Sequence, residues 1–434
     1  NDTLQNIRLE ISASADETGA GTTTEPQVWI EDNLTWTLDA DGTLTISGTG
    51  AMKNYDYDSN QSPVYNNSDV KKIVIEDGVT SIGAYAFYDC SSLTSITIPS
   101  IVTSIGNSAF DGCRSLKSIT IPDSVTSIGN SAFEACNSLS SITLSNNITS
   151  IGAAAFYDCS SLTSITIPDS VTSIGGSAFH SCSNLKSITI PDSVTSIESA
   201  VFYNCTSLTS ITIPDSVTSI GSYAFQDCSS LTSITIPDSV TSIGTMAFYN
   251  CTSLTSITIP DSVTSIGYNT FESCSSLTSI TIPKSVTSIG SGVFDKCNNL
   301  TVYLESGSTL TSNALGVDES KIVSYWNEGN LTWKLDANGT LTISGTGAMK
   351  DYNDNDNRSP IYKNSSVKKI VVEKGVTSIG ESAFENCSSL TSVMIPDSVI
   401  SIGTSAFHSC SRLPSITIPD SVTSIGNFAF EACN

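Results

Sequence analysis

Apolar and polar positions repeat every 23 residues over most of this chain. One unit, residues 231–253, reads LTSITIPDSVTSIGTMAFYNCTS, and the same frame occurs ten times before residue 300 and three times after residue 375. A period of this size is typical of a solenoid, in which each repeat forms one coil. Because one coil cannot bury its own apolar edge, we expect the stacked coils to share one continuous core.

Each unit predicts the same local elements. Ile234 and Ile236 alternate with polar residues, which indicates a strand buried on one side and ended by Pro237. The stretch that follows alternates again, so we expect Val240 and Ile243 to point inward while Thr241 and Ser242 face water. We expect Gly244 to supply the backbone freedom for the next corner. Thirteen of the fourteen phenylalanines stand three residues before a cysteine, and this spacing predicts a short helical turn with both side chains on one face.

The chain has thirteen cysteines, and all of them follow this period. Disulfides between adjacent coils are one interpretation, since neighbouring Cα atoms would lie about 5 Å apart. Buried reduced thiols are favoured instead, because every cysteine has two equivalent neighbours and an odd total prevents complete pairing. No metal site is expected, because the sequence has no C-x-x-C and no histidine neighbour with metal-ligand spacing.

Two blocks of repeats begin with similar segments. The segment LTWKLDANGTLTISGTGAMK, after Asn330, nearly duplicates LTWTLDADGTLTISGTGAMK, after Asn33. Both read as β-hairpins that cover the edge of a first coil. The expected organisation is as follows: a polar N-terminal lead (1–32), a β-hairpin opening cap (33–75), a ten-coil solenoid (76–297), a closing cap (298–326), a duplicated opening cap (327–374) and three further repeats, apparently truncated (375–434).

The frame L-x-x-I-x-I-P-x-S-V-x-x-I-G-x-x-A-F-x-x-C resembles the BspA-like leucine-rich repeats, also called the Treponema pallidum type. The resemblance implies an α+β solenoid, a right-handed leucine-rich-repeat coil of short strands and short helical turns. It implies a secreted or cell-surface protein that adheres to other cells or binds a host protein, the extracellular matrix or a glycan. It implies no catalytic residues and no cofactor, so we expect a protein that is not an enzyme.

Composition is consistent with that class. The formal net charge is −24, with 42 acidic and 18 basic residues, and such a field repels nucleic acid and anionic membranes, so neither is an expected partner. No apolar run is long enough to insert into a membrane. The polar start at Asn1 looks like that of a mature or trimmed product, and the end at Asn434 suggests that the natural protein continues.

The outward positions of the first strand form a column of threonines flanked by serines. In leucine-rich repeats this strand face is where ligands usually bind, and a lattice of small hydroxyl groups suits weak, multivalent contact with a repetitive partner. Threonine rows also occur in ice-binding solenoids, and threonine is also simply a good strand residue that faces water. The candidate binding residues are Thr97, Thr120, Thr143, Thr166, Thr189, Thr212, Thr235, Thr258 and Thr281.

A column of aspartates follows the strand in five consecutive coils. Stacked carboxylates about 5 Å apart repel one another, so they are candidates for binding Ca²⁺ or another cation. The favoured interpretation is an Asx-type turn, because one carboxylate per coil falls short of a calcium coordination shell. The candidates are Asp169, Asp192, Asp215, Asp238 and Asp261.

Residues around the Ala-Phe segment vary from coil to coil and offer a second candidate surface. His180 and His408 fall in this segment, and we interpret them as exposed residues without chemistry. No nucleophile elbow or phosphate-binding glycine pattern occurs. Two functions remain open: a binding module for adhesion, or a structural spacer or stalk that displays another domain.

Overall fold

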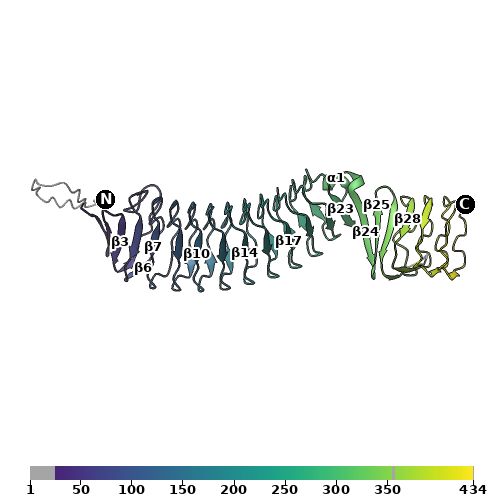
Figure 1. Cartoon of the computed structure of the whole chain (residues 1–434), viewed down its shortest axis with the longest axis horizontal. Coiled ribbons are helices and arrows are strands. Elements are labelled where there is room, and N and C mark those ends of the chain that lie inside the picture. Colours follow the sequence, from purple (N-terminus) through teal and green to yellow (C-terminus); the bar gives the residue numbers. More distant parts are fainter. Residues whose placement is uncertain (1–24, 354–356, 434) are drawn as a thin grey trace, which may run out of the picture. The chain divides into compact units, whose positions relative to one another are not determined.

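A computed structural model describes residues 25–353 and 357–433 of the chain. Contacts divide the chain into two compact units, Asn1–Leu277 with Ser288–Asn298, and Thr278–Thr287 with Asn299–Asn434. Strands and turns make up nearly all of both units, as Figure 1 shows. The α-helix found in the described residues, α1 (Ser312–Leu315), is four residues long. The predicted solenoid is therefore present, but the described residues form a β-solenoid and not the expected α+β one.

The first unit opens on an antiparallel meander of three strands. β1 (Gln27–Glu31) pairs with β2 (Leu34–Leu38), and β2 pairs with β3 (Thr43–Gly48). β3 then pairs in parallel with β5 (Lys72–Ile75), and β5 pairs with β7 (Ser95–Thr97). The predicted hairpin is thus the pair β2 and β3, and it does lie on the edge of the first coil.

The meander begins earlier than the sequence predicts. β1 falls inside residues 1–32, which were expected to be a polar lead, so the boundary at residue 33 is wrong for this strand. Its side chains gave little signal because Val28 and Ile30 remain 48% and 68% exposed. A short second pair, β4 (Gly50–Ala51) with β6 (Val79–Ser81), starts another ladder beside the first.

Most coils of the first unit add one short strand to each of two parallel rows, here called the first and second ladders, and each ladder is divided into more than one hydrogen-bonded sheet. At Ile105 and Ile197 the second ladder has isolated bridges in place of strands. Adjacent coils align serine with serine, isoleucine with isoleucine and, in the first ladder, threonine with threonine. The first ladder comprises β8 (Ser118–Thr120), β10 (Ser141–Thr143), β12 (Ser164–Thr166), β14 (Ser187–Thr189), β15 (Ser210–Thr212), β17 (Ser233–Thr235) and β19 (Ser256–Thr258). The second comprises β9 (Ser127–Ile128), β11 (Ser150–Ile151), β13 (Ser173–Ile174), β16 (Ser219–Ile220), β18 (Ser242–Ile243), β20 (Ser265–Ile266) and β22 (Ser288–Ile289).

The segment that carries phenylalanine and cysteine is not helical. Met246 and Asn250 have φ angles of 53° and 56°, in the left-handed region that a right-handed helix does not admit. The backbone N–H of Cys251 donates to the Phe248 carbonyl at 3.3 Å, while the N–H of Phe248 donates to the Thr270 carbonyl of the next coil at 2.9 Å. The expected helical turn is therefore replaced by consecutive turns that are hydrogen-bonded from coil to coil.

The glycine at the preceding corner has a steric role. Gly244 does not adopt a positive φ; instead, a Cβ atom added to it would lie 2.5 Å from the Ser222 nitrogen and 2.6 Å from the Gly221 carbonyl carbon. The expectation of special backbone freedom at Gly244 is therefore wrong. Glycine stands there because the backbone of the neighbouring coil occupies the space of a side chain.

The core of the first unit is a stack of identical layers. Val240 and Ile243 are buried as predicted, and the phenylalanine rings lie face to face, with Phe110 and Phe133 5.3 Å apart at an angle of 2°. From Cys113 to Cys274, each thiol of this stack also donates a hydrogen bond to the backbone carbonyl of the phenylalanine one coil earlier, as Cys136 does to Phe110 at 3.2 Å. Cys90, in the first coil, donates to the Val64 carbonyl instead. Aromatic and sulfur columns thus tie each coil to the next.

The second unit contains a further meander in the middle of a continuous sheet. β23 pairs in parallel with β24, and β24 then pairs antiparallel with β25, as β1 does with β2. The segment 298–326 was expected to close the first solenoid, but its last strand is the first strand of the second opening module. The strands are β21 (Ser279–Ile282), β23 (Thr301–Glu305), β24 (Ile322–Glu328), β25 (Leu331–Asp336), β26 (Thr340–Gly345), β28 (Lys369–Val372) and β30 (Ser392–Met394).

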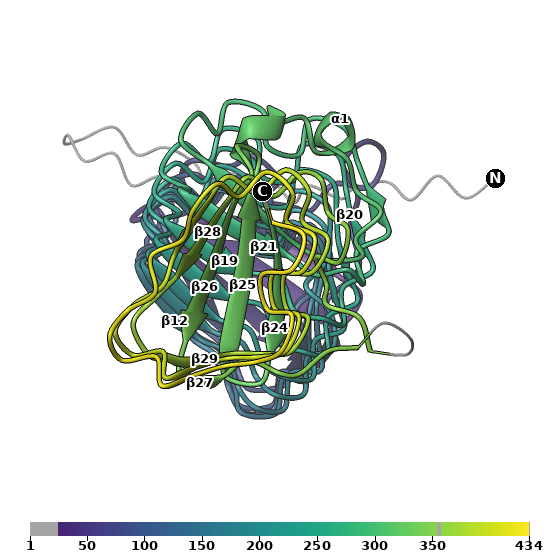
Figure 2. The ribbon, with the colours of Figure 1, turned by 90° about the vertical axis from the view of Figure 1, so that its right-hand side faces the viewer.

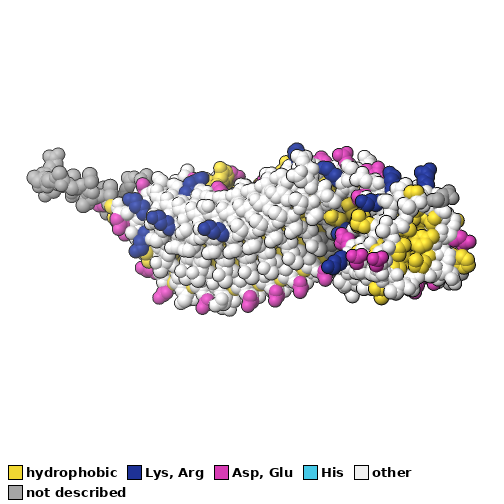
Figure 3. All heavy atoms as spheres, turned by 45° about the vertical axis from the view of Figure 1, so that its right-hand side comes forward, with side chains coloured by type: hydrophobic (Ala, Val, Ile, Leu, Met, Phe, Trp, Pro, Cys, Tyr) yellow, Lys and Arg dark blue, Asp and Glu magenta, His cyan; other side chains and the backbone are white. Residues whose placement is uncertain are grey.

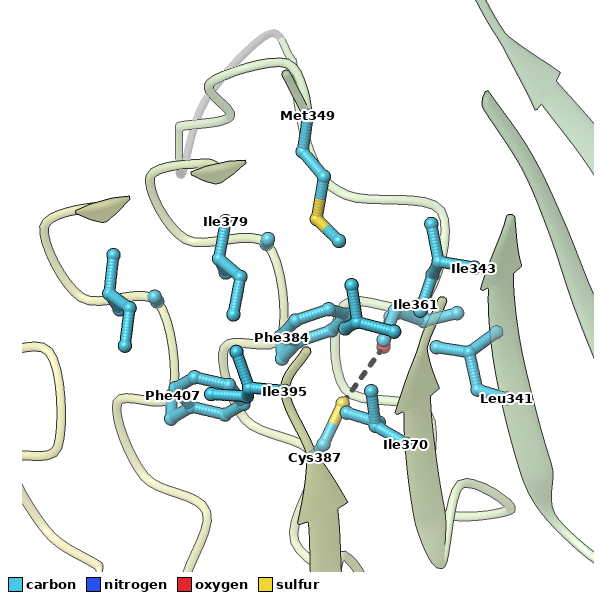
Figure 4. Close-up of a cluster of buried hydrophobic side chains, with 14 of the residues drawn as sticks. Leu341, Ile343, Met349, Ile361, Ile370, Ile379, Phe384, Cys387, Ile395 and Phe407 are labelled. Carbon is cyan, nitrogen blue, oxygen red and sulfur yellow. Dashed lines mark hydrogen bonds between the residues drawn. The ribbon is translucent and has the colours of Figure 1, made fainter. Parts of the chain in front are cut away.

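Shorter elements complete the second unit. A 3-10 turn, η1 (Glu319–Lys321), leads into β24, and a second ladder runs through β27 (Gly347–Ala348), β29 (Val376–Ile379), β31 (Ser401–Ile402) and β32 (Ser424–Ile425). The strands of the meander are visible in Figure 2. Figure 4 shows the core beneath them, where Phe384 and Phe407 lie side by side and the Cys387 thiol donates to the Ile361 carbonyl.

Candidate binding surfaces

The predicted threonine column lies on the outer face of the first ladder. Eight of its members, from Thr97 to Thr258, are exposed. Thr281 belongs to the second unit, where it is half-buried and lies opposite Tyr303 of β23. Neighbouring strands of such a ladder are about 4.8 Å apart, so each coil presents one serine and one threonine hydroxyl group at that interval.

The hydroxyl groups of this column differ from those of the other threonines. Thr232 and Thr241 donate theirs to the backbone carbonyls of Thr209 and Thr218, one coil earlier. Within the described residues, the hydroxyl groups of the candidate column, such as that of Thr235, make no such bond. They are therefore available to a ligand, whereas many threonines of the other two columns bond to the neighbouring coil.

Charges of opposite sign border the threonine face. The exposed side chains of Lys71, Lys117 and Lys186 come directly before strands of the ladder. Exposed aspartates follow the strands at the other end. Figure 3 shows acidic side chains in a row along one edge of the molecule and basic side chains away from that edge. A ligand on this face would therefore lie between a short basic border and a longer acidic border.

The five candidate aspartates are exposed and regularly spaced, one in each coil. The turn that holds Asp238 is closed by the Val240 N–H and the Pro237 carbonyl at 3.0 Å, and Ser239 Oγ donates to the Val217 carbonyl. In the part of the chain that the structure describes, no three His, Cys, Asp or Glu side chains come together as a metal site. Cation binding by this column stays a prediction.

The two histidines are more enclosed than the sequence predicts. His180 is half-buried between Tyr157 and Tyr203, with ring centroids 4.3 and 4.4 Å away, and partial burial lowers the pKa of His180, against the opposing charge of Asp158. His408 lies 3.6 Å from Glu385. The expectation of freely exposed histidines is wrong because side chains at the same position of successive coils stack on one another.

The cysteines are reduced, and all except the half-buried Cys433 are buried. Burial raises the pKa of Cys90 to about 12, so its thiol stays protonated at neutral pH. This agrees with the prediction of apolar core thiols. Nothing about these groups points to a nucleophile or a redox centre, which needs an accessible thiol with a lowered pKa.

A shallow groove of about 480 Å³ follows the second ladder of the first unit. Its floor consists of Ser-Ile-Gly segments from four successive coils, residues 219–221, 242–244, 265–267 and 288–290. No charged side chain lines it, and its walls combine backbone, small hydroxyl groups, isoleucine side chains and Tyr268. Among the described residues, no helix is long and apolar enough to cross a membrane.

The repeat pattern matches a known family profile. Residues 60–186, 172–301 and 358–434 match the BspA type leucine rich repeat region, in six copies. A search of curated proteins gives no match.

Solved structures of bacterial repeat proteins are similar to this chain. A leucine-rich repeat protein from Bacteroides ovatus is 28% identical over 93% of this chain and 92% of that chain, with a TM-score of 0.46. One from Eubacterium ventriosum is 26% identical over 93% of each chain, with a TM-score of 0.47. A leucine rich cell surface protein from Faecalibacterium prausnitzii is 30% identical over 68% of this chain and 99% of that chain, with a TM-score of 0.40.

Proposed function

Because this chain belongs to the BspA-type leucine-rich repeat family, we propose that it is a non-enzymatic binding module for adhesion at the cell surface or outside the cell. Its ligand is a host protein, a matrix component or a glycan with a repeating structure. The similar protein from Faecalibacterium prausnitzii, described as a cell surface protein, supports the location.

One observation carries the choice of binding surface. The hydroxyl groups of the candidate column, such as those of Thr166, Thr189 and Thr212, are exposed, and no bond within the described residues uses them. Many threonines of the neighbouring columns do bond within the stack, as Thr209 does to the Lys186 carbonyl. Threonine is a good strand residue in all of these columns, so strand propensity alone does not account for a free hydroxyl group at one position in every coil.

The repeat turns a weak contact into useful affinity. A single hydroxyl hydrogen bond contributes about 0.5–1.5 kcal/mol, which is too little to hold a ligand. Successive coils offer the same group at about 4.8 Å intervals, and a ligand with its own repeat engages several of them once the first contact is made. This supports a long, repetitive ligand over a small molecule in a deep pocket.

Matched substitutions test the threonine face. Replacement of Thr166, Thr189 and Thr212 by valine removes three hydroxyl groups and keeps the branched shape, while replacement of the same residues by serine keeps the hydroxyl groups. We expect the valine variant to lose tenfold or more in retention on arrays of matrix proteins and glycans, with the serine variant within about threefold of the parent protein.

The same arrays test the alternative role. A spacer or stalk that displays another domain predicts no retention of the parent protein by any ligand. Retention that is equal for the parent protein and the valine variant would remove the threonine face from the proposal and leave another surface as the binding site.

A further inference from the structure

Four tyrosines gather on the surface of the first unit and form a single cluster, here called the tyrosine patch. Tyr65 and Tyr88 stack face to face, with ring centroids 5.0 Å apart at an angle of 7°. Tyr57 stands nearly perpendicular to both, at 6.1 and 5.8 Å. Tyr85 packs against Tyr88 at 5.6 Å. Tyr57 nevertheless remains 57% exposed, so it offers water an aromatic ring whose orientation is fixed by its neighbours.

The loop that carries Tyr57 is held in place by its own hydrogen bonds. The Asp56 carboxylate accepts from the backbone N–H groups of Asp58, Ser59 and Asn60, at 3.0, 2.7 and 2.9 Å. The Gln61 side chain donates to the Tyr57 carbonyl at 3.0 Å. A large aromatic side chain on such a preorganised loop loses little conformational entropy when a ligand packs on it.

The duplicated opening module provides an internal comparison. At the positions that correspond to Tyr57, Tyr85 and Tyr88, the second module has Asp354, Ser382 and Glu385. Tyr362, which corresponds to Tyr65, is retained, but Arg358 lies over its ring, 4.9 Å from the centroid. The core tyrosine of the module is kept in both copies, as Tyr55 and Tyr352. Packing of the module therefore does not require the tyrosine patch, since the second copy forms the same meander without it.

The groups around the patch favour a neutral, hydroxyl-rich ligand. Asp58 directly follows Tyr57 in the chain, and Asp89 directly follows Tyr88, so each carboxylate belongs to a residue next to a tyrosine of the patch. Burial raises the pKa of Tyr65, and the charges of Tyr57, Asp89 and Asp58 raise it further. Asp58 is exposed, and Asp89 lies 3.9 Å from Arg114. Carboxylates accept strong hydrogen bonds from hydroxyl groups, and together with the net charge of −24 they repel anions.

We propose that the tyrosine patch is a carbohydrate-binding site that takes a neutral sugar ring on Tyr57. The apolar C–H face of a pyranose packs on the exposed ring through dispersion contacts, while the ring hydroxyl groups donate to the carboxylate of Asp58. The site lies where a loop of the opening module meets the first coil, and it is separate from the threonine face, so it does not depend on the binding surface proposed above.

The test uses the full chain and defined neutral probes. Maltohexaose, cellohexaose, mannohexaose and a galactan are immobilised, with heparin as the polyanionic and decaproline as the peptide comparison. We expect retention by at least one neutral sugar and none by heparin. Tyr57→Ala is expected to weaken that retention tenfold or more, while Tyr57→Trp, which keeps an aromatic ring, retains it.

A matched control separates the patch from any exposed tyrosine. Tyr268 is 61% exposed in the same unit, and Tyr268→Ala is expected to change retention by less than twofold. Circular dichroism and the thermal midpoint of Tyr57→Ala should equal those of the parent protein, since an exposed loop side chain is removed.

Three results would overturn the proposal. They are no retention by any of the neutral sugars at millimolar concentration, equal retention of Tyr57→Ala and the parent protein, and preferential binding of decaproline. The valine variant of the threonine face is expected to keep its sugar binding, so loss of sugar binding in that variant alone would assign the sugar to the strand face instead.

Discussion

The thiol of Cys251 donates a hydrogen bond to the backbone carbonyl of Phe225, 3.1 Å away and one coil earlier. The same bond recurs from coil to coil, so cysteine contributes both volume and a polar link to the stack. The column of cysteines is thus part of the structure of the core, and it would be lost if the thiols were oxidised to disulfides.

Removal of one thiol tests this role. We expect Cys251→Ala to lower the free energy of unfolding by about 1–3 kcal/mol, because it leaves a cavity and an unpaired position in the core. Cys433→Ala is the control, since Cys433 is only half-buried and its loss should cost clearly less. Urea denaturation followed by circular dichroism measures both; equal costs for the two variants would show that burial of the thiol is unimportant.

Stability is expected to fall in alkaline solution. Burial raises the pKa of Cys90 from 9.0 to about 12, and it raises those of the other core cysteines as well. Between these two pKa values the thiol of the unfolded chain loses its proton, while the thiol of the folded chain keeps it. The contribution of each thiol to the free energy of unfolding is therefore fully present below pH 9 and falls by about 1.4 kcal/mol per pH unit above it. Thermal midpoints measured from pH 7 to pH 11 should fall progressively above pH 9, and a flat profile would contradict the burial of these thiols.

A side chain at the corner glycine should be costly. In Gly244→Ala the new Cβ atom would meet the backbone of the preceding coil at 2.5 Å, so the coils must move apart. We expect the free energy of unfolding to fall by about 1–3 kcal/mol. Gly176→Ala is the matched control, because its nearest atom, the Ser199 oxygen, is 3.1 Å away; its thermal midpoint should fall less.

Glu198 occupies the same corner position in its own coil and should be a weak point. The second ladder is divided there into one sheet that ends at β13 and another that begins at β16. We expect Glu198→Gly to raise the thermal midpoint by several degrees, because glycine lets the neighbouring coils approach as they do at Gly221. Hydrogen exchange of the Ile197 and residue 198 amides should slow in this variant. A lower midpoint would show that the glutamate side chain stabilises the coil.

The period of the sequence predicts the coil count, the buried columns and the free thiols, because each of these depends on one side chain per repeat. The left-handed backbone at Met246 and Asn250 could not be predicted in the same way. No glycine marks those positions, and the hydrogen bonds that fix them come from the next coil. The spacing of Phe248 and Cys251 is the same in a helical turn and in the observed turns, so it does not distinguish them.

The sequence predicts the threonine face but not the tyrosine patch, because only the first depends on one side chain per repeat. Exposed Thr235 follows directly from alternation along one strand. The tyrosine patch was missed, because Tyr57 and Tyr88 belong to a loop and a coil that meet only in the folded unit. Comparison of the duplicated modules was the available signal, since it reveals tyrosines present in one copy and replaced in the other.

β24 accepts a parallel strand on one edge and an antiparallel strand on the other. A block of repeats that begins with such a strand can follow an earlier block directly, because its first strand pairs with the last parallel strand of that block. Gene duplication can therefore lengthen this architecture by whole blocks, after which each copy is free to diverge in its loops while its core residues, such as Trp36 and Trp333, are retained.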